Sequence, residues 1–200
     1  MLTARGRRPI LLLFFFSVFV MVACNRTQPP PPPSSFQPEA TIKDIMDSMV
    51  DPSADVLWES VATIVSAAGI EERQPRTDDD WKNVHRHAVI LVEATNLLKM
   101  DGRHVAKPRE KSENPGIELE PEQMEQLIKD DRQAFIKFAQ GLHDAALPAL
   151  RATEARDPKA LLDAGEAIDT ACENCHLKYW YPLSTQAERA KEGAASPRKP

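Results

Sequence analysis

Apolar side chains recur every three to four residues in four stretches of the chain, and this spacing constrains the fold more than any other feature. Such spacing predicts amphipathic helices, each of which needs a partner surface to cover its apolar face. The stretches lie at about 41–68, 78–100, 121–149 and 158–181. Because no stretch alternates apolar and polar residues, we predict an all-α fold, an antiparallel four-helix bundle over residues 40–182.

Prolines predict two interruptions within these stretches. Asp51 and Pro52 can serve as the cap and first residue of a new helix, so we expect a kink or break there. The new helix should cover 52–68 and stop at Gly69. Pro148 should kink or end the third helix, because proline lacks an N–H and clashes with the preceding turn.

The remaining boundaries are predicted from capping residues. Thr77 should cap the second helix in a reciprocal pair with Asp80. Asp157 should cap the fourth helix, with Pro158 as its first residue. Residues 101–119 are polar and broken by glycine and proline, so they should form a long irregular connection of the kind that is often mobile or functional.

The last predicted helix carries Cys172, Cys175 and His176 in the spacing C-x-x-C-H. Residues three and four apart share one face of a helix, so both thiols can reach the two vinyl groups of one porphyrin. His176 then lies beside the ring and can offer a nitrogen to the iron. This spacing is the attachment signature of a c-type haem, so we predict one covalent haem c near the C-terminal end of this helix.

Three other uses of these residues were weighed against haem attachment. A structural zinc site needs a second Cys/His pair at similar spacing, and a thioredoxin-like dithiol needs a βαβ context. A structural disulfide would use two of only three cysteines in the chain. Each alternative has less support than haem attachment, and the third cysteine, Cys24, has a separate explanation.

Residues 1–23 combine a basic start with an apolar run, as an export signal peptide does. The run ends in Met21-Val22-Ala23-Cys24, which resembles a bacterial lipobox. We expect cleavage before Cys24 and a lipid on its thiol, with Asn25 favouring the outer membrane. Ordinary cleavage nearby and an uncleaved anchor are the alternatives. All of them export the domain to the periplasmic side, where c-type haem is attached.

The segments that flank the domain are not expected to fold. Residues 24–39 include five consecutive prolines, which favour an extended polyproline tether spanning on the order of 30 Å over ten residues. Residues 183–200 are small and charged, as in a disordered tail. The formal net charge of −5 gives no basic footprint for nucleic acid, whereas an acidic surface suits basic redox partners.

Four helices with C-x-x-C-H at the end of the last one resemble the class II cytochromes c, which include cytochrome c′ and the low-spin cytochromes c556. The resemblance covers about residues 40–182 and rests on Cys172, Cys175 and His176 and on methionines in the first helix. It implies that His176 is the proximal iron ligand and that the first helix forms the distal face. Pro52 departs from the family pattern in that helix. Members of the family often dimerise, so the resemblance also implies a homodimer as one possible oligomeric state.

The resemblance implies two alternative functions. In c556-like members a methionine takes the sixth iron position, and the protein carries electrons. In cytochromes c′ that position is open, and the iron binds nitric oxide or carbon monoxide. We predict a periplasmic electron carrier that exchanges single electrons with redox partner proteins, with gas binding as the alternative. No triad, phosphate loop or paired carboxylates appear, so we expect no enzyme activity.

The sixth ligand should come from the first helix. Met46 is the first choice because it better matches the methionine of the low-spin relatives, and Met49 is the second because it is close to the expected break. Both could instead fill gaps in the core, as methionine does well. Weaker candidates are the histidines outside the motif, of which His85 is nearest the apolar stripe: His85, His87, His104 and His143.

Overall fold

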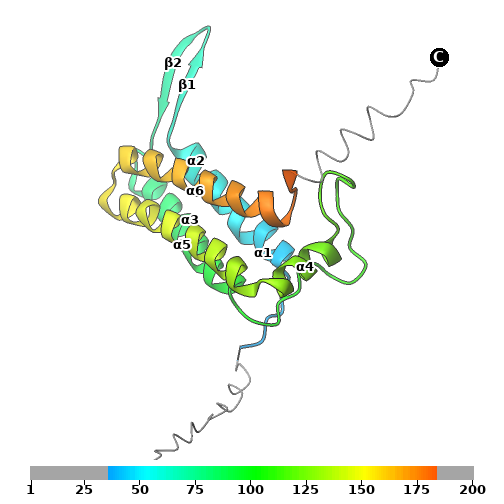
Figure 1. Cartoon of the computed structure of the whole chain (residues 1–200). Coiled ribbons are helices and arrows are strands. Elements are labelled where there is room, and N and C mark those ends of the chain that lie inside the picture. Colours follow the sequence, from blue (N-terminus) through cyan, green and yellow to red (C-terminus); the bar gives the residue numbers. More distant parts are fainter. Residues whose placement is uncertain (1–35, 184–200) are drawn as a thin grey trace, which may run out of the picture. The chain divides into compact units, whose positions relative to one another are not determined.

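The computed structural model describes residues 36–183, and these residues are mostly helical (Figure 1). They fall within one compact unit, Ser34–Pro200. The predicted signal peptide, Cys24, most of the proline tether and all but the first residue of the predicted tail lie outside the described residues.

The first helical segment has three successive parts: α1 (Ile42–Ile45), the π-helical turn η1 (Met46–Val50) and α2 (Asp51–Ser60). Of the kink or break predicted at Asp51–Pro52, the break is wrong, because helical turns continue through both residues. Asp51 is itself helical, its side chain caps nothing, and its backbone N–H donates to the carbonyl of Met46, five residues earlier. Pro52 has no N–H to place, so the first turn of α2 accommodates it directly after the wider π turn.

A β-hairpin replaces the second half of the helix predicted at 52–68. Strand β1 (Ala62–Ser66) pairs antiparallel with β2 (Gly69–Arg73), and Val65 lies opposite Ile70. β-Branched side chains fill the middle of β1, and over so short a window apolar spacing cannot separate strand from helix. Gly69 has a φ of 125° at the turn, where it was expected to stop a helix. The all-α prediction therefore holds only as a mostly helical fold.

Two predicted helix starts are confirmed. Thr77 and Asp80 form a reciprocal capping box at the start of α3 (Asp78–Leu98), with N···O distances of 3.1 and 2.9 Å. Asp157 accepts a hydrogen bond from the N–H of Ala160 at the start of α6 (Pro158–Tyr179). These contacts join residues three positions apart, so the sequence alone predicts them.

The third predicted helix is two helices, α4 (Pro121–Asp130) and α5 (Arg132–Ala155). Asp131, with φ −141° and ψ 71°, leaves the helical conformation and caps α5 through its side chain. Pro148 lies inside α5 and does not end it, because close packing of the fully buried Ala146 and Ala149 holds the surrounding turns together. The helix instead ends at Arg156, with φ 53°.

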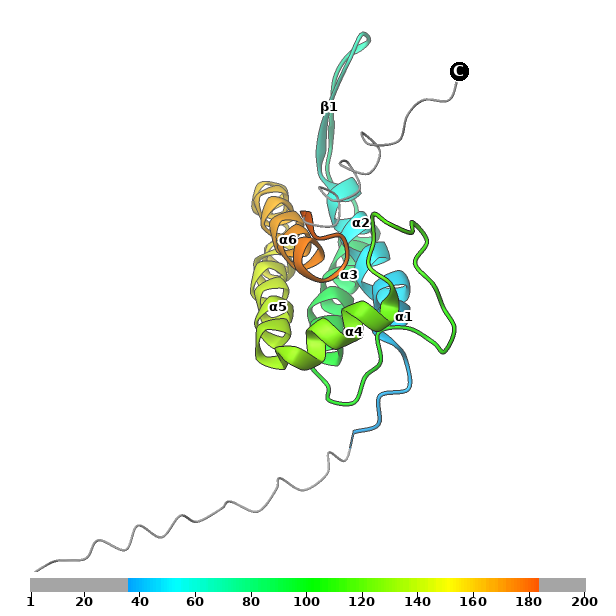
Figure 2. The same ribbon diagram turned by 45° about the vertical axis from the view of Figure 1, so that its right-hand side comes forward.

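The long helices pack side by side around a common core. Helix α5 lies between α3 and α6, and α2 contacts both α3 and α6. The largest fully buried apolar side chains come from α1, α2, α3 and α6: Ile45, Leu57, Leu91, Leu161 and Ile168. Figure 2 shows α4 running crosswise to the long helices, and in both views the hairpin projects away from them. Within residues 36–183, no helix combines the length and apolar character required to cross a membrane.

Candidate functional site

The motif residues lie on the last two turns of α6. Cys172, Cys175 and His176 are each half-buried, and both thiols are free. Cys175 and His176 line two adjoining pockets, and Cys172 lines the smaller of them. The structure therefore brings together the three residues that the sequence predicted as one site, and it points them toward the same hollow.

The two pockets form one hollow, because they share five lining residues, Met46, Asp51, Phe135, Cys175 and His176. The larger pocket has a cavity volume of about 150 Å³ and is open at its mouth. Ligand pockets in proteins commonly measure about 300–1,000 Å³. A group of cofactor size would therefore fill the hollow and extend into its open mouth.

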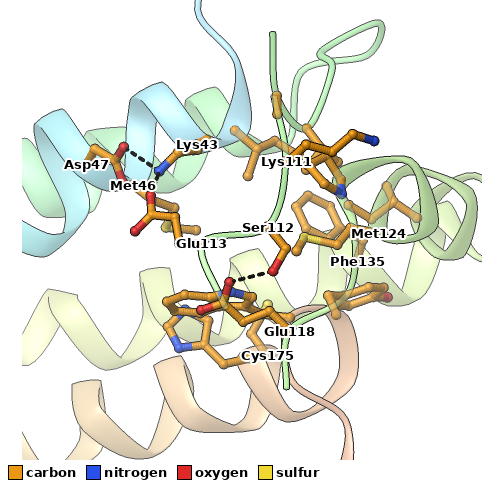
Figure 3. Close-up of a pocket in the computed structure, with 18 of the residues that line it drawn as sticks. Lys43, Met46, Asp47, Lys111, Ser112, Glu113, Glu118, Met124, Phe135 and Cys175 are labelled. Carbon is orange, nitrogen blue, oxygen red and sulfur yellow. Dashed lines mark hydrogen bonds and ion pairs between the residues drawn. The ribbon is translucent and has the colours of Figure 1, made fainter. Parts of the chain in front are cut away.

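The wall that faces α6 comes from the first helical segment. Met46, the first residue of η1, lines both pockets, whereas Met49 lines neither. Figure 3 shows Met46 and Cys175 projecting from helices on opposite sides of the pocket. Both methionines pack against the core, but only Met46 also lines the hollow beside the motif, and this separates the two candidates.

The connection between α3 and α4 completes this wall. Its carbonyls at His104 and Val105 accept hydrogen bonds of 2.9 Å from the N–H groups of Ile42 and Lys43, which a helix start leaves without internal partners. At its other end, the N–H of Leu119 donates to the carbonyl of Trp180 at 2.8 Å. The residues predicted only as an irregular connection are thus fastened across the pocket.

Charged pairs fasten the same connection at the pocket mouth. The Nζ of Lys43 lies 2.8 Å from Glu113 and 3.0 Å from Asp47 (Figure 3). Sequence reasoning missed Val105, Lys43 and Glu113 as pocket residues. The apolar pair Val105-Ala106 within a polar stretch is the signal that could have revealed the wall, because a buried side chain in a loop needs a surface to cover.

Burial controls the protonation of the motif side chains. It raises the pKa of Cys172 to about 11 and that of Cys175 to about 12, so both thiols are neutral at pH 7. Burial also lowers the pKa of His176, and the carboxylates of Asp51 and Glu173 oppose this effect. A neutral imidazole keeps the nitrogen lone pair that a metal ligand requires.

Tyr179 provides an orphaned polar group beside the hollow. Its hydroxyl is buried and has no hydrogen-bond partner within residues 36–183, and burial raises its pKa to about 12. Its ring lines the larger pocket and meets Phe135 and Phe138 edge to face, at 5.4 and 5.8 Å between centroids. A buried donor without a partner is costly, so this hydroxyl fits a site that receives a polar group from a bound molecule.

The other histidines have partners elsewhere. His85 lies 3.0 Å from the hydroxyl of Thr153, and His104 lies 3.1 Å from Glu125. His87 and His143 also contact polar neighbours, and none of the four lines either pocket. The described part of the chain contains no group of three or more His, Cys, Asp or Glu side chains that could hold a metal ion. Haem iron needs no such group, because the porphyrin supplies four ligands.

Comparison with known proteins adds no relative to this picture. No family model matches the sequence, no curated protein matches it, and no solved structure matches the fold. The chemistry of the hollow is therefore the basis for assigning a function.

Proposed function

We propose that this protein is a monohaem c-type cytochrome, similar to the class II cytochromes c, that carries single electrons on the periplasmic side of a bacterial membrane. Cys172 and Cys175 would hold one haem c through thioethers, and His176 would be its proximal iron ligand. One observation carries the proposal: the C-x-x-C-H residues of α6 line a mainly apolar hollow whose far wall presents Met46.

The donor set fits this group. The two thiols and the imidazole lie on the last turns of one helix, as attachment to a single porphyrin requires. Most other side chains around them are apolar, among them Ile42, Val105 and Phe135. We also propose that α2, α3, α5 and α6 form the four-helix bundle of that family.

When bound, the haem supplies one-electron redox chemistry, and the protein sets its potential and its access to water. The connection 99–120 covers part of the hollow, and the apolar side chains that line it disfavour water. Asp51 lies at its edge, where partial burial raises the pKa of the carboxyl group. These residues bind, shield and orient the group, and the proposal includes no catalytic residue.

We propose Met46 as the sixth ligand, with Met49 as the second choice. Met46 lines both pockets together with His176, and its position in a π turn agrees with the tendency of such turns to occur at functional sites. A thioether at this position favours the reduced iron, as suits an electron carrier.

Export and anchoring complete the proposal. A lipid on Cys24 would attach the mature chain to a membrane, with the outer membrane favoured, and the proline tether would hold the domain away from the surface. The partners would be redox proteins that approach the haem edge. A homodimer is compatible with this role and is not required by it.

The experiment that tests the proposal is an optical spectrum of the full-length protein purified from a host that attaches c-type haem. We expect haem that stays with the polypeptide after acid–organic extraction, and a low-spin reduced spectrum that carbon monoxide leaves unchanged. Free haem in the organic phase would overturn covalent attachment.

Gas binding is the second candidate function, and the same spectrum decides it. The hollow opens to solvent at its mouth, and Met46 is only half-buried, so a small ligand has a route to the iron. Covalent haem that is high-spin when reduced and binds carbon monoxide readily would replace electron transfer with gas binding.

A further inference from the structure

The residues just beyond α6 fold back over the motif histidine. The carbonyl of His176 accepts hydrogen bonds from the N–H groups of Trp180 and Tyr181, at 2.8 and 3.0 Å. The indole of Trp180 meets the imidazole edge to face, with 4.9 Å between ring centroids. This turn brings the side chain of Tyr181 to the imidazole, on the same helix end as the pocket.

The hydroxyl of Tyr181 joins the imidazole to a carboxylate. It lies 2.7 Å from Oε2 of Glu173, a distance at which the O–H donates to the carboxylate. The same oxygen lies 3.5 Å from Nδ1 of His176, a weak contact that is longer than the usual N–H···O distance of about 2.7–3.2 Å.

The direction of this chain of bonds selects the histidine tautomer. Because the hydroxyl proton points at Glu173, the lone pair of the hydroxyl oxygen is left to accept the N–H at Nδ1 of His176. A proton on Nδ1 leaves the lone pair of Nε2 free. A ligating histidine in proteins almost always donates its second ring N–H to such a partner, which fixes the ring and raises its basicity.

We propose that Tyr181 and Glu173 are positioning residues for the proximal ligand: they hold the proton of His176 on Nδ1, present Nε2 to the iron, and strengthen it as an electron donor. This inference rests on the proposed function, because it assigns the surroundings of the proximal ligand. A stronger donor stabilises ferric over ferrous iron. Removing the hydroxyl or the carboxylate should therefore raise the reduction potential.

The test compares the reduction potentials of the full-length holoprotein and of Tyr181→Phe and Glu173→Gln. Tyr181→Phe keeps the ring and deletes only the hydroxyl, and Glu173→Gln leaves the tyrosine in place should the first variant fold poorly. We expect either change to weaken the relative stabilisation of ferric iron by about tenfold, which raises the potential by about 59 mV for a one-electron couple. Asp169→Asn is the matched control, since it removes one charge from the exposed face of the same helix.

A second readout reports the iron–histidine bond directly. In the Met46→Ala background, the iron–histidine stretching frequency of the ferrous protein should fall in both variants and stay unchanged in Asp169→Asn. Unchanged potentials in both variants would overturn the proposal, as would an equal shift in Asp169→Asn, which would indicate a general effect of charge. A wild-type protein without covalent haem would overturn the proposed function itself, so the two failures are distinguishable.

Discussion

The two walls of the hollow are built in different ways. The α6 wall is one regular helix, and its motif residues lie within five positions of one another. The facing wall combines the π turn η1 with an irregular connection more than fifty residues away along the chain. Hydrogen bonds and ion pairs between distant residues hold that second wall together, notably those from Lys43 to Val105 and Glu113.

For the proposed cytochrome, this difference would separate two tasks within one site. Covalent attachment needs only a fixed local spacing, which a helix provides by itself. Shielding and sixth-position ligation need a surface at a set distance from α6, which only packing between elements can provide. Changes in the α6 wall should therefore abolish the cofactor, and changes in the facing wall should alter its access and spin state.

Loss of the thiols should have the largest effect. Cys172→Ala with Cys175→Ala removes both thioether positions, so we expect complete loss of covalent haem on a haem-stained denaturing gel. Asn174→Ala, an exposed position between the two cysteines, should keep full staining. Staining of the double variant equal to wild type would place the attachment elsewhere.

Removal of Met46 should change the spin state without releasing the haem. We expect Met46→Ala to convert a low-spin ferrous spectrum to a high-spin one that binds carbon monoxide, because the facing wall loses its ligand. Met49→Ala is the matched control and should stay low-spin, since Met49 lines neither pocket. The reverse pattern would make Met49 the ligand.

Truncation of Val105 should measure how much the connection contributes to stability. The side chain of Val105 lines the larger pocket and is only 6% exposed. Val105→Ala should therefore lower the free energy of unfolding by about 2 kcal/mol. Urea denaturation measures this change. Val65→Ala makes the same change on the hairpin, where the side chain is 75% exposed, and should cost less than about 0.5 kcal/mol. Equal costs would mean that the connection does not pack as a wall.

Acid should lower the stability of the facing wall by protonating Asp44, and this is the smallest of the four expected effects. The ammonium of Lys107, 2.6 Å away, and hydrogen bonds from Thr41 lower the pKa of Asp44 from 3.8 to about 2. A lowered folded-state pKa stabilises the protein above pH 3.8, and this stabilisation is lost as the pH falls through 2.

The measurement is the melting temperature of Asp44→Asn against wild type at several pH values. We expect wild type to melt higher at pH 5 and the difference to vanish below pH 2. Asp55→Asn, which removes an exposed carboxylate from α2, is the matched control for the loss of one charge. A difference that persists unchanged at pH 2 would show that the carboxylate charge contributes nothing.

Several features follow from the sequence because they depend on neighbouring residues. The capping box at Thr77 and the side-chain N-cap at Asp157 are confirmed, and each joins groups three residues apart. The shared position of Cys172, Cys175 and His176 on α6 also follows from helical spacing. Interactions of such short range depend little on the rest of the chain, so a sequence pattern is sufficient to predict them.

Tertiary structure decided the features that depend on distant contacts. Val65 belongs to a strand because its pairing with β2 outweighs an ambiguous apolar pattern, and Pro148 stays within α5 because the helix is packed on its buried face. Met46, and not Met49, lines the pockets together with His176, although both methionines belong to the same π turn. The connection 99–120 forms a pocket wall because its carbonyls accept hydrogen bonds from the first N–H groups of α1. No local sequence pattern predicts these bonds, because the two segments meet only when the chain has folded.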